Sequence, residues 1–325
     1  MLTSTSTPTW YTAYGSNQRG YMVKRKQQSK NRSVWFALLG LAVLGVVLFV
    51  LSRGHNVALL NSQGLVANEQ RRLLILSTSI MLGLAIPTLG LLYFFAWKYR
   101  DTNPRAAHDP HARPHRAVPA FLWGIPLIVL AILVSIMLPA TQRLEPSRQI
   151  DSDRELLKIQ VVALRWKWLF IYPDQKIATV NYAQIPVDTP VQFELTADET
   201  PMSSFWIPNL AGQLYAMTEH VNRLNVMADT VGDYPGSVAE INGAGFSGMR
   251  FTTRVSSQQD FETWVVNVQG SPDQLSFEQY AELLQPSENN PEAFFRDPDP
   301  KLFGTILSKY VGSNDESAKH DHGGY

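Results

Sequence analysis

The hydrophobic positions divide the chain into two unlike parts. Three long apolar runs without a charged residue lie before residue 141, at 34–51, 73–97 and 121–140. A helix needs about 20 consecutive apolar residues to cross a bilayer. The runs 73–97 and 121–140 therefore predict two transmembrane helices joined by a short loop.

The first apolar run, 34–51, has two open interpretations. It follows a tail, 1–33, that carries six Lys and Arg residues and no Asp or Glu. A basic tail before a short apolar segment is typical of a cleaved signal peptide and also of a retained signal anchor. The run predicts one of these two elements.

The loops predict the orientation of the helices. Segment 98–120 contains five Lys and Arg residues against two Asp residues. Loops rich in Lys and Arg stay on the cytoplasmic side. We therefore expect a cytoplasmic loop at 98–120, a cytoplasmic tail at 1–33 if the first run is an anchor, and an external domain after about residue 143.

Residues 150–256 have the pattern of an all-β domain. Residues 157–161 alternate between apolar and polar side chains, as a half-buried strand does. Turn residues separate further short apolar runs, which are 177–180, 191–195, 224–227 and 250–255. Short strands at this spacing predict a β-sandwich or barrel.

The last part of the chain, 257–312, predicts a helical extension. Phe261, Trp264 and Val265 share one face of a helix over 257–268. Ser276 with Gln279 resembles a capping box, and 299–300 reads Asp-Pro, a typical helix start. The tail 313–325 has the polar composition of a disordered segment. The predicted fold class is a membrane-anchored α+β protein.

The charge of the chain is zero overall but unevenly distributed. From residue 151 onward there are 24 acidic and 12 basic residues, so the external part is strongly acidic. This excess argues against a nucleic-acid partner, which needs a basic surface. The chain contains no cysteine, which excludes disulfides, thiolate metal sites and cysteine nucleophiles.

Four segments resemble subunit II of the haem–copper respiratory oxidases in order and spacing. Segment 203–208 is similar to the family's H-S-F-W-x-P, and 243–249 to the second half of its C-x-E-x-C-G-x-x-H-x-x-M motif. Segments 95–100 and 165–170 resemble the end of the first hairpin helix and an aromatic stretch of the external domain. The resemblance implies a cupredoxin-like fold for that domain.

In the copper-bearing members these motifs hold a binuclear copper centre. By the resemblance, Ser203 and Phe246 stand at the two histidine positions. Val238 and Asn242 stand at the two cysteine positions, and only Met249 keeps its ligand type. Soft sulfur ligands together with imidazole select copper, so we expect no metal here. The chain resembles the quinol oxidase branch, of the cytochrome bo type, which lacks this centre.

The resemblance implies a non-catalytic subunit of a proton-translocating ubiquinol oxidase that reduces oxygen to water. We then expect no catalytic residue and no cofactor in this chain, with haem and copper in subunit I. The expected partners are subunit I, small membrane subunits and lipid. The expected place is the bacterial inner membrane, with a periplasmic domain. The alternatives are a cytochrome c oxidase subunit with an aberrant copper site, and a membrane-anchored cupredoxin-like binding or copper-handling module.

Three further residues have roles implied by the resemblance. Trp166 matches an electron-entry tryptophan, and without copper we expect it to pack at the interface with subunit I. Glu240 matches an acid that helps to bind Mg²⁺ at the subunit interface, although one carboxylate alone is a weak predictor of such a site. We expect Met249 to fill space in the core or an interface.

Overall fold

The computed structural model describes residues 58, 60–100, 103–104, 115, 117–200 and 202–311. The predicted basic tail 1–33, the first apolar run 34–51 and the tail 313–325 lie outside the described residues. Most of the predicted loop 98–120 does so as well.

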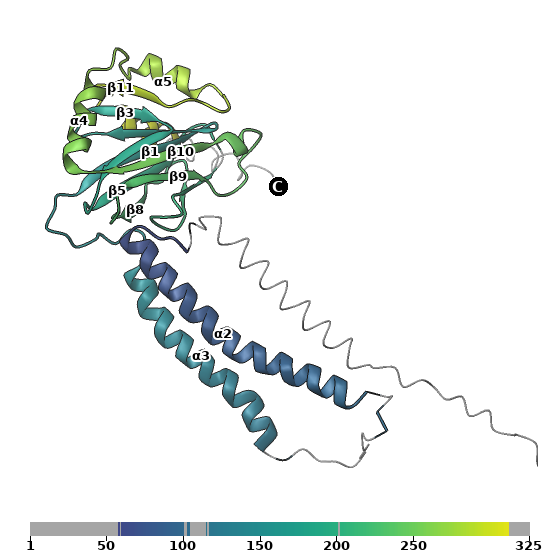
Figure 1. Cartoon of the computed structure of the whole chain (residues 1–325). Coiled ribbons are helices and arrows are strands. Elements are labelled where there is room, and N and C mark those ends of the chain that lie inside the picture. Colours follow the sequence, from purple (N-terminus) through teal and green to yellow (C-terminus); the bar gives the residue numbers. More distant parts are fainter. Residues whose placement is uncertain are drawn as a thin grey trace, which may run out of the picture. The chain divides into compact units, whose positions relative to one another are not determined.

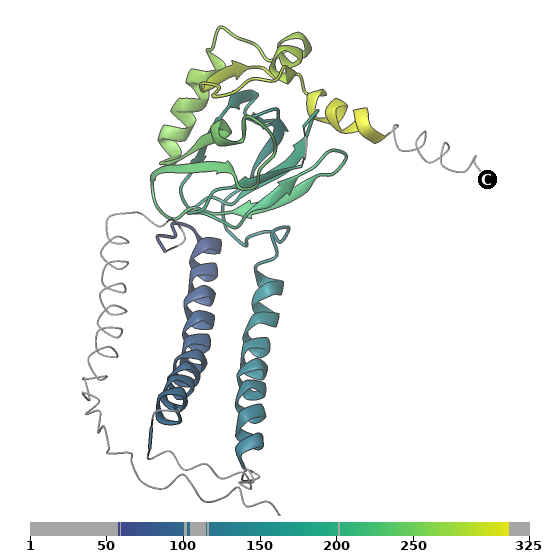
Figure 2. The same ribbon diagram turned by 90° about the vertical axis from the view of Figure 1, so that its right-hand side faces the viewer.

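Two long apolar helices follow each other in the chain and run side by side (Figure 2). They are α2 (Leu65–Lys98) and α3 (Ala117–Arg143), and by length and composition both could cross a membrane. At 1.5 Å per residue α2 is about 50 Å long, whereas the apolar core of a bilayer is about 30 Å thick. Both helices therefore extend beyond the runs 73–97 and 121–140, because hydropathy marks the part suited to lipid and the helix continues past it.

The start of α2 is joined to the β-domain by backbone hydrogen bonds. The Leu65 amide donates to the Met227 carbonyl at 3.1 Å, and the Ala67 amide donates to the Leu210 carbonyl at 3.2 Å. A Cβ atom at Gly64 would lie 2.8 Å from the Met227 carbonyl oxygen. Only glycine allows the two backbones to approach this closely.

The β-domain consists of two sheets with a shared core. One sheet has the order β11-β3-β2-β1-β5-β8 and the other has the order β4-β10-β9-β6-β7. Pairs β1–β5 and β4–β10 are parallel, and the other pairs are antiparallel. The first ten strands are β1 (Leu157–Leu164), β2 (Lys167–Tyr172), β3 (Ile177–Val180), β4 (Tyr182–Pro186), β5 (Val191–Ala197), β6 (Ser203–Trp206), β7 (Leu214–Ala216), β8 (Asn222–Val226), β9 (Gly232–Val238) and β10 (Arg250–Ser256).

Aromatic rings from both sheets meet in the core. Phe205 of β6 stacks on Phe251 of β10 with ring centroids 4.9 Å apart, and Trp168 of β2 meets Phe205 edge-on at 5.2 Å. All three side chains are buried. The structure confirms the predicted cupredoxin-like β-sandwich, and five of its strands lie on the five predicted runs.

The C-terminal extension contains the predicted helices and one strand that was not predicted. The helices are α4 (Gln258–Gln269), α5 (Phe277–Leu284) and α6 (Leu302–Val311). The predicted helices are confirmed, and the strand β11 (Ala293–Arg296), which pairs with β3, is an addition that the pattern did not predict. Figure 1 shows β11 at the edge of its sheet, with α4 packed beside it. The run is only four residues long and is a strand because the edge of β3 offers it hydrogen-bond partners.

A second apolar core lies between the extension and the outer face of the six-stranded sheet. Leu169 and Ile171 of β2 pack there with Tyr280, Phe295 and Phe303 of the extension. Every residue of β2 is therefore buried. A strand covered on both faces shows no apolar–polar alternation, which explains why the sequence pattern did not identify β2.

The predicted helix starts are mostly confirmed. The Ser276 hydroxyl accepts a hydrogen bond from the Gln279 amide at 3.2 Å, but the Gln279 side chain bonds Glu282 instead of returning to Ser276. The capping box is thus half formed. The carboxylate of Asp299 accepts from the Lys301 amide at 2.8 Å, which caps the turn that leads into α6.

Candidate functional site

The fold brings together the five positions that correspond to copper ligands in the relatives. Ser203 begins β6, and Val238 ends β9. Asn242 and Phe246 lie in the loop that follows β9, and Met249 directly precedes β10. Because β9 pairs with both β6 and β10, the three segments are held next to one another.

Three of these side chains form a buried neutral cluster. Asn242 Nδ2 donates to Ser203 Oγ at 2.9 Å and to Met249 Sδ at 3.2 Å. Ser203 and Met249 are fully buried, and Asn242 is 6% exposed. Asn242 Oδ1 has no hydrogen-bond partner among the described residues. Below, Ser203, Asn242 and Met249 are called the Asn242 cluster.

The remaining two positions are apolar. Val238 is buried in the core, and Phe246 is half-buried against it. Val238 therefore contributes to the packing of the sandwich. Phe246 starts a single 3₁₀ turn, 246–248, that closes the loop before β10.

These residues do not fit a copper pair. Such a centre needs thiolate and imidazole electron pairs, and the cluster offers a hydroxyl, an amide and one thioether. The amide N–H points at Met249 Sδ and so occupies the sulfur that a metal would use. Within the described residues no group of three or more His, Cys, Asp or Glu side chains could hold a metal ion.

Trp166 packs against the loop that carries Asn242. It occupies the turn between β1 and β2 with a φ of 62°, a conformation that costs a non-glycine residue free energy. A Cβ atom at Gly245 would lie 2.4 Å from Trp166 Cγ, and one at Gly243, whose φ is 128°, would lie 3.1 Å from the indole. The two glycines make room for the indole. Trp166 is only half-buried, and its predicted contact with subunit I stays a prediction.

Glu240 is exposed and accepts a hydrogen bond from the Tyr215 hydroxyl of β7. This bond, burial and the charge of Glu240 raise the pKa of Tyr215. The bond links the loop after β9 to β7, at the edge of the five-stranded sheet. The Mg²⁺ position at Glu240 stays a prediction.

A second buried polar cluster was not found from the sequence. Asp198, directly after β5, is 1% exposed. Its carboxylate accepts from the Tyr280 hydroxyl at 2.6 Å, from Lys309 Nζ at 3.1 Å and from the Tyr310 hydroxyl. Below, these four residues are called the Asp198 cluster. Asp198 lies between 82 and 112 positions before its three partners, so no local spacing in the sequence predicts the cluster.

Burial and hydrogen bonds shift the pKa values in this cluster. Burial, and then the hydrogen bond to Asp198, raise the pKa of Tyr280. Burial tends to lower the pKa of Lys309, but the hydrogen bonds to Glu199 and Asp198 outweigh this and raise it. Burial also raises the pKa of Tyr310, so the cluster keeps both tyrosines neutral and its lysine charged well above neutral pH.

Comparison with known proteins shows the family to which the chain belongs. Residues 269–314, which include most of the extension, match the family model described as COX Aromatic Rich Motif. The chain is 41% identical over 284 residues to cytochrome bo(3) ubiquinol oxidase subunit 2 of Pseudomonas putida, covering 87% of this chain and 89% of that protein. The chain belongs to the ubiquinol oxidase subunit 2 family.

A further relative and a solved structure are also similar to the chain. Ubiquinol oxidase subunit 2 of Acetobacter aceti is 38% identical over 263 residues, with coverage of 80% of this chain and 85% of that protein. Among solved structures, the periplasmic domain of subunit II of cytochrome oxidase of Bradyrhizobium japonicum matches with a TM-score of 0.34 and 20% identity, over 36% of this chain and 94% of that one. Membership of the subunit 2 family confirms the resemblance found in the sequence.

Proposed function

We propose that this chain is the non-catalytic subunit 2 of a proton-translocating quinol oxidase, which oxidises ubiquinol and reduces oxygen to water. The observation that carries the proposal is the Asn242 cluster. The Asn242 amide donates hydrogen bonds to the Ser203 hydroxyl and to the Met249 thioether, at the positions of the copper ligands in the copper-bearing relatives. Without a relay the external domain has no electron to receive.

The nature of the electron donor explains why an external domain without an electron relay is sufficient for the oxidase. A soluble protein donor needs an electron acceptor outside the membrane. Ubiquinol dissolves in the bilayer and reaches haem in subunit I directly. In this proposal haem and copper belong to subunit I, and the chain contributes no catalytic residue and binds no cofactor.

The chain's own contribution is assembly. The apolar side chains of α2 and α3 are exposed along the length of both helices, and such surfaces need lipid or neighbouring helices around them. We place the hairpin in the bacterial inner membrane against subunit I and further small membrane subunits. The β-domain caps subunit I on the periplasmic side, with Trp166 as the candidate contact.

Oxygen uptake by the detergent-solubilised complex tests the proposal. The complex is purified through a tag on this chain, and either a short-chain ubiquinol or reduced cytochrome c is supplied. We expect haem to co-purify and uptake to occur with ubiquinol only. Uptake with cytochrome c would contradict the proposal, since electrons would then enter through a centre in the external domain.

The same preparation tests the copper-handling alternative. Copper is measured on this chain after it is separated from the complex, both before and after incubation with a copper salt. Haem-free chain with bound copper would support the alternative and overturn the proposed function. Met202 directly precedes β6, Met217 directly follows β7, and Met249 directly precedes β10. Met249 is buried whereas Met202 is exposed, so these two methionines do not share a surface.

A further inference from the structure

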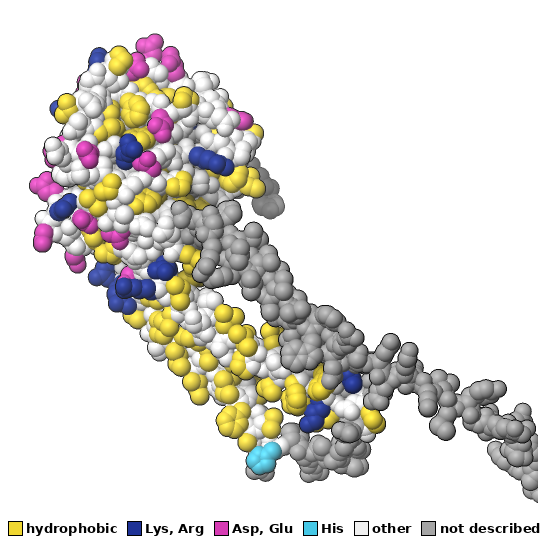
Figure 3. All heavy atoms as spheres, viewed as in Figure 1, with side chains coloured by type: hydrophobic (Ala, Val, Ile, Leu, Met, Phe, Trp, Pro, Cys, Tyr) yellow, Lys and Arg dark blue, Asp and Glu magenta, His cyan; other side chains and the backbone are white. Residues whose placement is uncertain are grey.

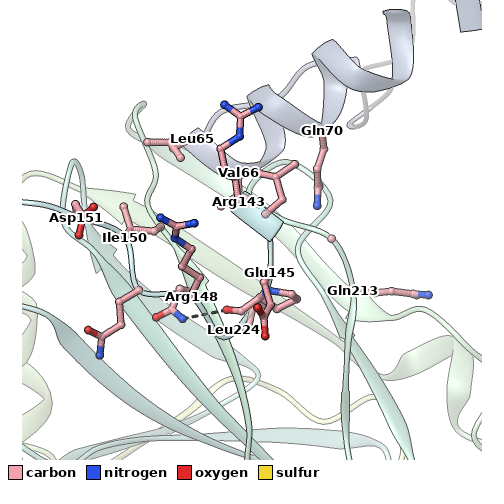
Figure 4. Close-up of a pocket in the computed structure, with 15 residues that line it drawn as sticks. Leu65, Val66, Gln70, Arg143, Glu145, Arg148, Ile150, Asp151, Gln213 and Leu224 are labelled. Carbon is pink, nitrogen blue, oxygen red and sulfur yellow. Dashed lines mark hydrogen bonds between the residues drawn. The ribbon is translucent and has the colours of Figure 1, made fainter. Parts of the chain in front are cut away.

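A cavity of about 350 Å³ lies where α2 and α3 meet the β-domain. Its walls come from the first turns of α2, the end of α3, the linker 144–151, and the β-domain segments 212–213 and 224–225. The volume is in the range of small-ligand sites, which begins at about 300 Å³. Figure 4 shows the side chains that line it.

Two guanidinium groups and two carboxylates line this cavity. Arg143 and Arg148 provide the first pair, and Glu145 and Asp151 the second. No ion pair within the described residues involves any of the four. In the view of Figure 4, Arg143 and Arg148 lie toward the side of Leu65, and Gln213 lies across from them. The charges are balanced, so the lining suits a ligand with both a negative and a positive group.

The cavity lies at the level where membrane headgroups are found. The apolar runs of α2 and α3 both end beside it, at residues 73 and 140. Lys and Arg side chains gather where the apolar helix surface meets the domain (Figure 3). Arginines at the end of a transmembrane helix reach to the interface while their stems stay in the apolar layer.

A second cavity, of about 290 Å³, continues from the first toward the helices. Leu144, Glu145 and Pro146 line both cavities. Its other walls are mostly apolar and come from α2 and α3, at Leu73, Met137, Ala140 and Thr141. A charged compartment and an apolar one thus share a wall at the membrane surface.

We propose that the two cavities bind one membrane phospholipid with an amine headgroup, of the phosphatidylethanolamine type. Arg143 and Arg148 bind the phosphodiester, because guanidinium forms paired hydrogen bonds to phosphate. Glu145 and Asp151 accept hydrogen bonds from the primary ammonium. An acyl chain follows Leu144 into the apolar cavity. The inference rests on the hairpin crossing the membrane, and not on the donor that the complex oxidises.

The bound lipid would fill the joint between the membrane helices and the domain. The Pro146 carbonyl, in the shared wall, accepts two hydrogen bonds from Asn225 of β8, both at 3.0 Å. These bonds fix the linker to the sheet, so the cavity keeps its shape. A preformed site loses less conformational freedom when it binds its ligand.

Native mass spectrometry of the purified complex, delipidated and then supplied with defined lipids, tests the proposal. We expect the double variant Arg143→Gln/Arg148→Gln to lower the affinity for one phosphatidylethanolamine roughly tenfold or more, since the charge-assisted hydrogen bonds of two guanidinium groups are lost. The matched control is Arg71→Gln, which removes a nearby cation that does not line the cavity. Equal losses in both variants, or no loss in the double variant, would overturn the proposal.

The headgroup and the acyl chain are tested separately. Glu145→Gln/Asp151→Asn is expected to shift the preference from phosphatidylethanolamine toward anionic phosphatidylglycerol, because the partners of the ammonium are gone. Water-soluble glycerophosphoethanolamine is expected to compete poorly. If it binds as tightly as the lipid, a free phosphodiester and not a lipid is the ligand. Oxygen uptake with ubiquinol, measured in parallel, shows whether the proposed function holds independently.

Discussion

The β-domain contains two buried polar clusters that stabilise it in different ways. The Asn242 cluster is neutral and closes the loop between β9 and β10. The Asp198 cluster is ionic and joins α5 and α6 to the end of β5. A neutral cluster can lose a member at the cost of one hydrogen bond, whereas a buried charge that loses its partners is left without compensation.

The position of each cluster explains the difference. Met249 of the Asn242 cluster belongs to the main hydrophobic core, and Asn242 donates to a hydroxyl and a thioether. The Asp198 cluster lies at the seam between a sheet and an added segment, where Lys309 is 41% exposed and reaches solvent. A charge can be buried there because its partner is only partly desolvated.

The largest expected effect is that of Asp198→Ala. It leaves the buried Tyr280 hydroxyl without its acceptor, and we expect a loss of about 3 kcal/mol in the free energy of unfolding. Thermal and urea unfolding of the full-length chain in detergent measure it. The control is Glu199→Gln, whose half-exposed ion pair with Lys309 should contribute less than about 1 kcal/mol. Equal losses would mean that the buried carboxylate is not what holds the extension.

A smaller effect is expected for Gly245→Ala, in the loop of the Asn242 cluster. The new methyl group would overlap the indole of Trp166, and such overpacking costs about 1–3 kcal/mol. The matched control is Gly304→Ala in α6, where a Cβ atom meets nothing within 4 Å. Alanine should stabilise that helix by up to about 1 kcal/mol. If both variants behave alike, the loop does not pack against Trp166.

The two clusters should also differ in their response to pH. The pKa values of Tyr280 and Lys309 are raised in the folded chain. Their stabilising contributions are therefore complete below the ordinary values of 10.0 and 10.5, and are lost as the pH rises above them. We expect the stability difference between the wild type and Tyr280→Phe to shrink above pH 10.0. If the stability difference between the wild type and Tyr280→Phe stays constant up to pH 11, the stabilising role given to the neutral Tyr280 hydroxyl is wrong.

The smallest effect is expected for Asn242→Leu. The substitution removes a hydrogen bond to Ser203, but it also removes a buried amide oxygen that has no partner among the described residues. The two changes offset each other, so we expect a change within about 1 kcal/mol. Asn242→Asp places a carboxylate in the same space and should destabilise the chain by several times more. Unfolding of both variants, side by side, checks the comparison.

The sequence alone determined the elements whose pattern is local. The apolar runs predicted α2 and α3, because crossing a bilayer requires a long uninterrupted apolar segment. Alternation predicted β1, and the absence of cysteine together with Ser203 and Asn242 predicted a site unsuited to copper. The helices and β1 depend on residues close together in the chain, so the order of the residues contains them. Ser203 and Asn242 lie 39 positions apart, and only the resemblance to the family's motifs related them to one site.

Only the tertiary structure decided what depends on contacts between distant segments. Strand β11 forms because β3 offers an open edge, and β2 is buried on both faces because the extension covers it. Asp198 meets Tyr280 across 82 positions, and the cavity beside Arg143 and Arg148 exists only where the helices meet the domain. Burial and charge pairing are properties of the folded chain, since they depend on which side chains exclude water from one another.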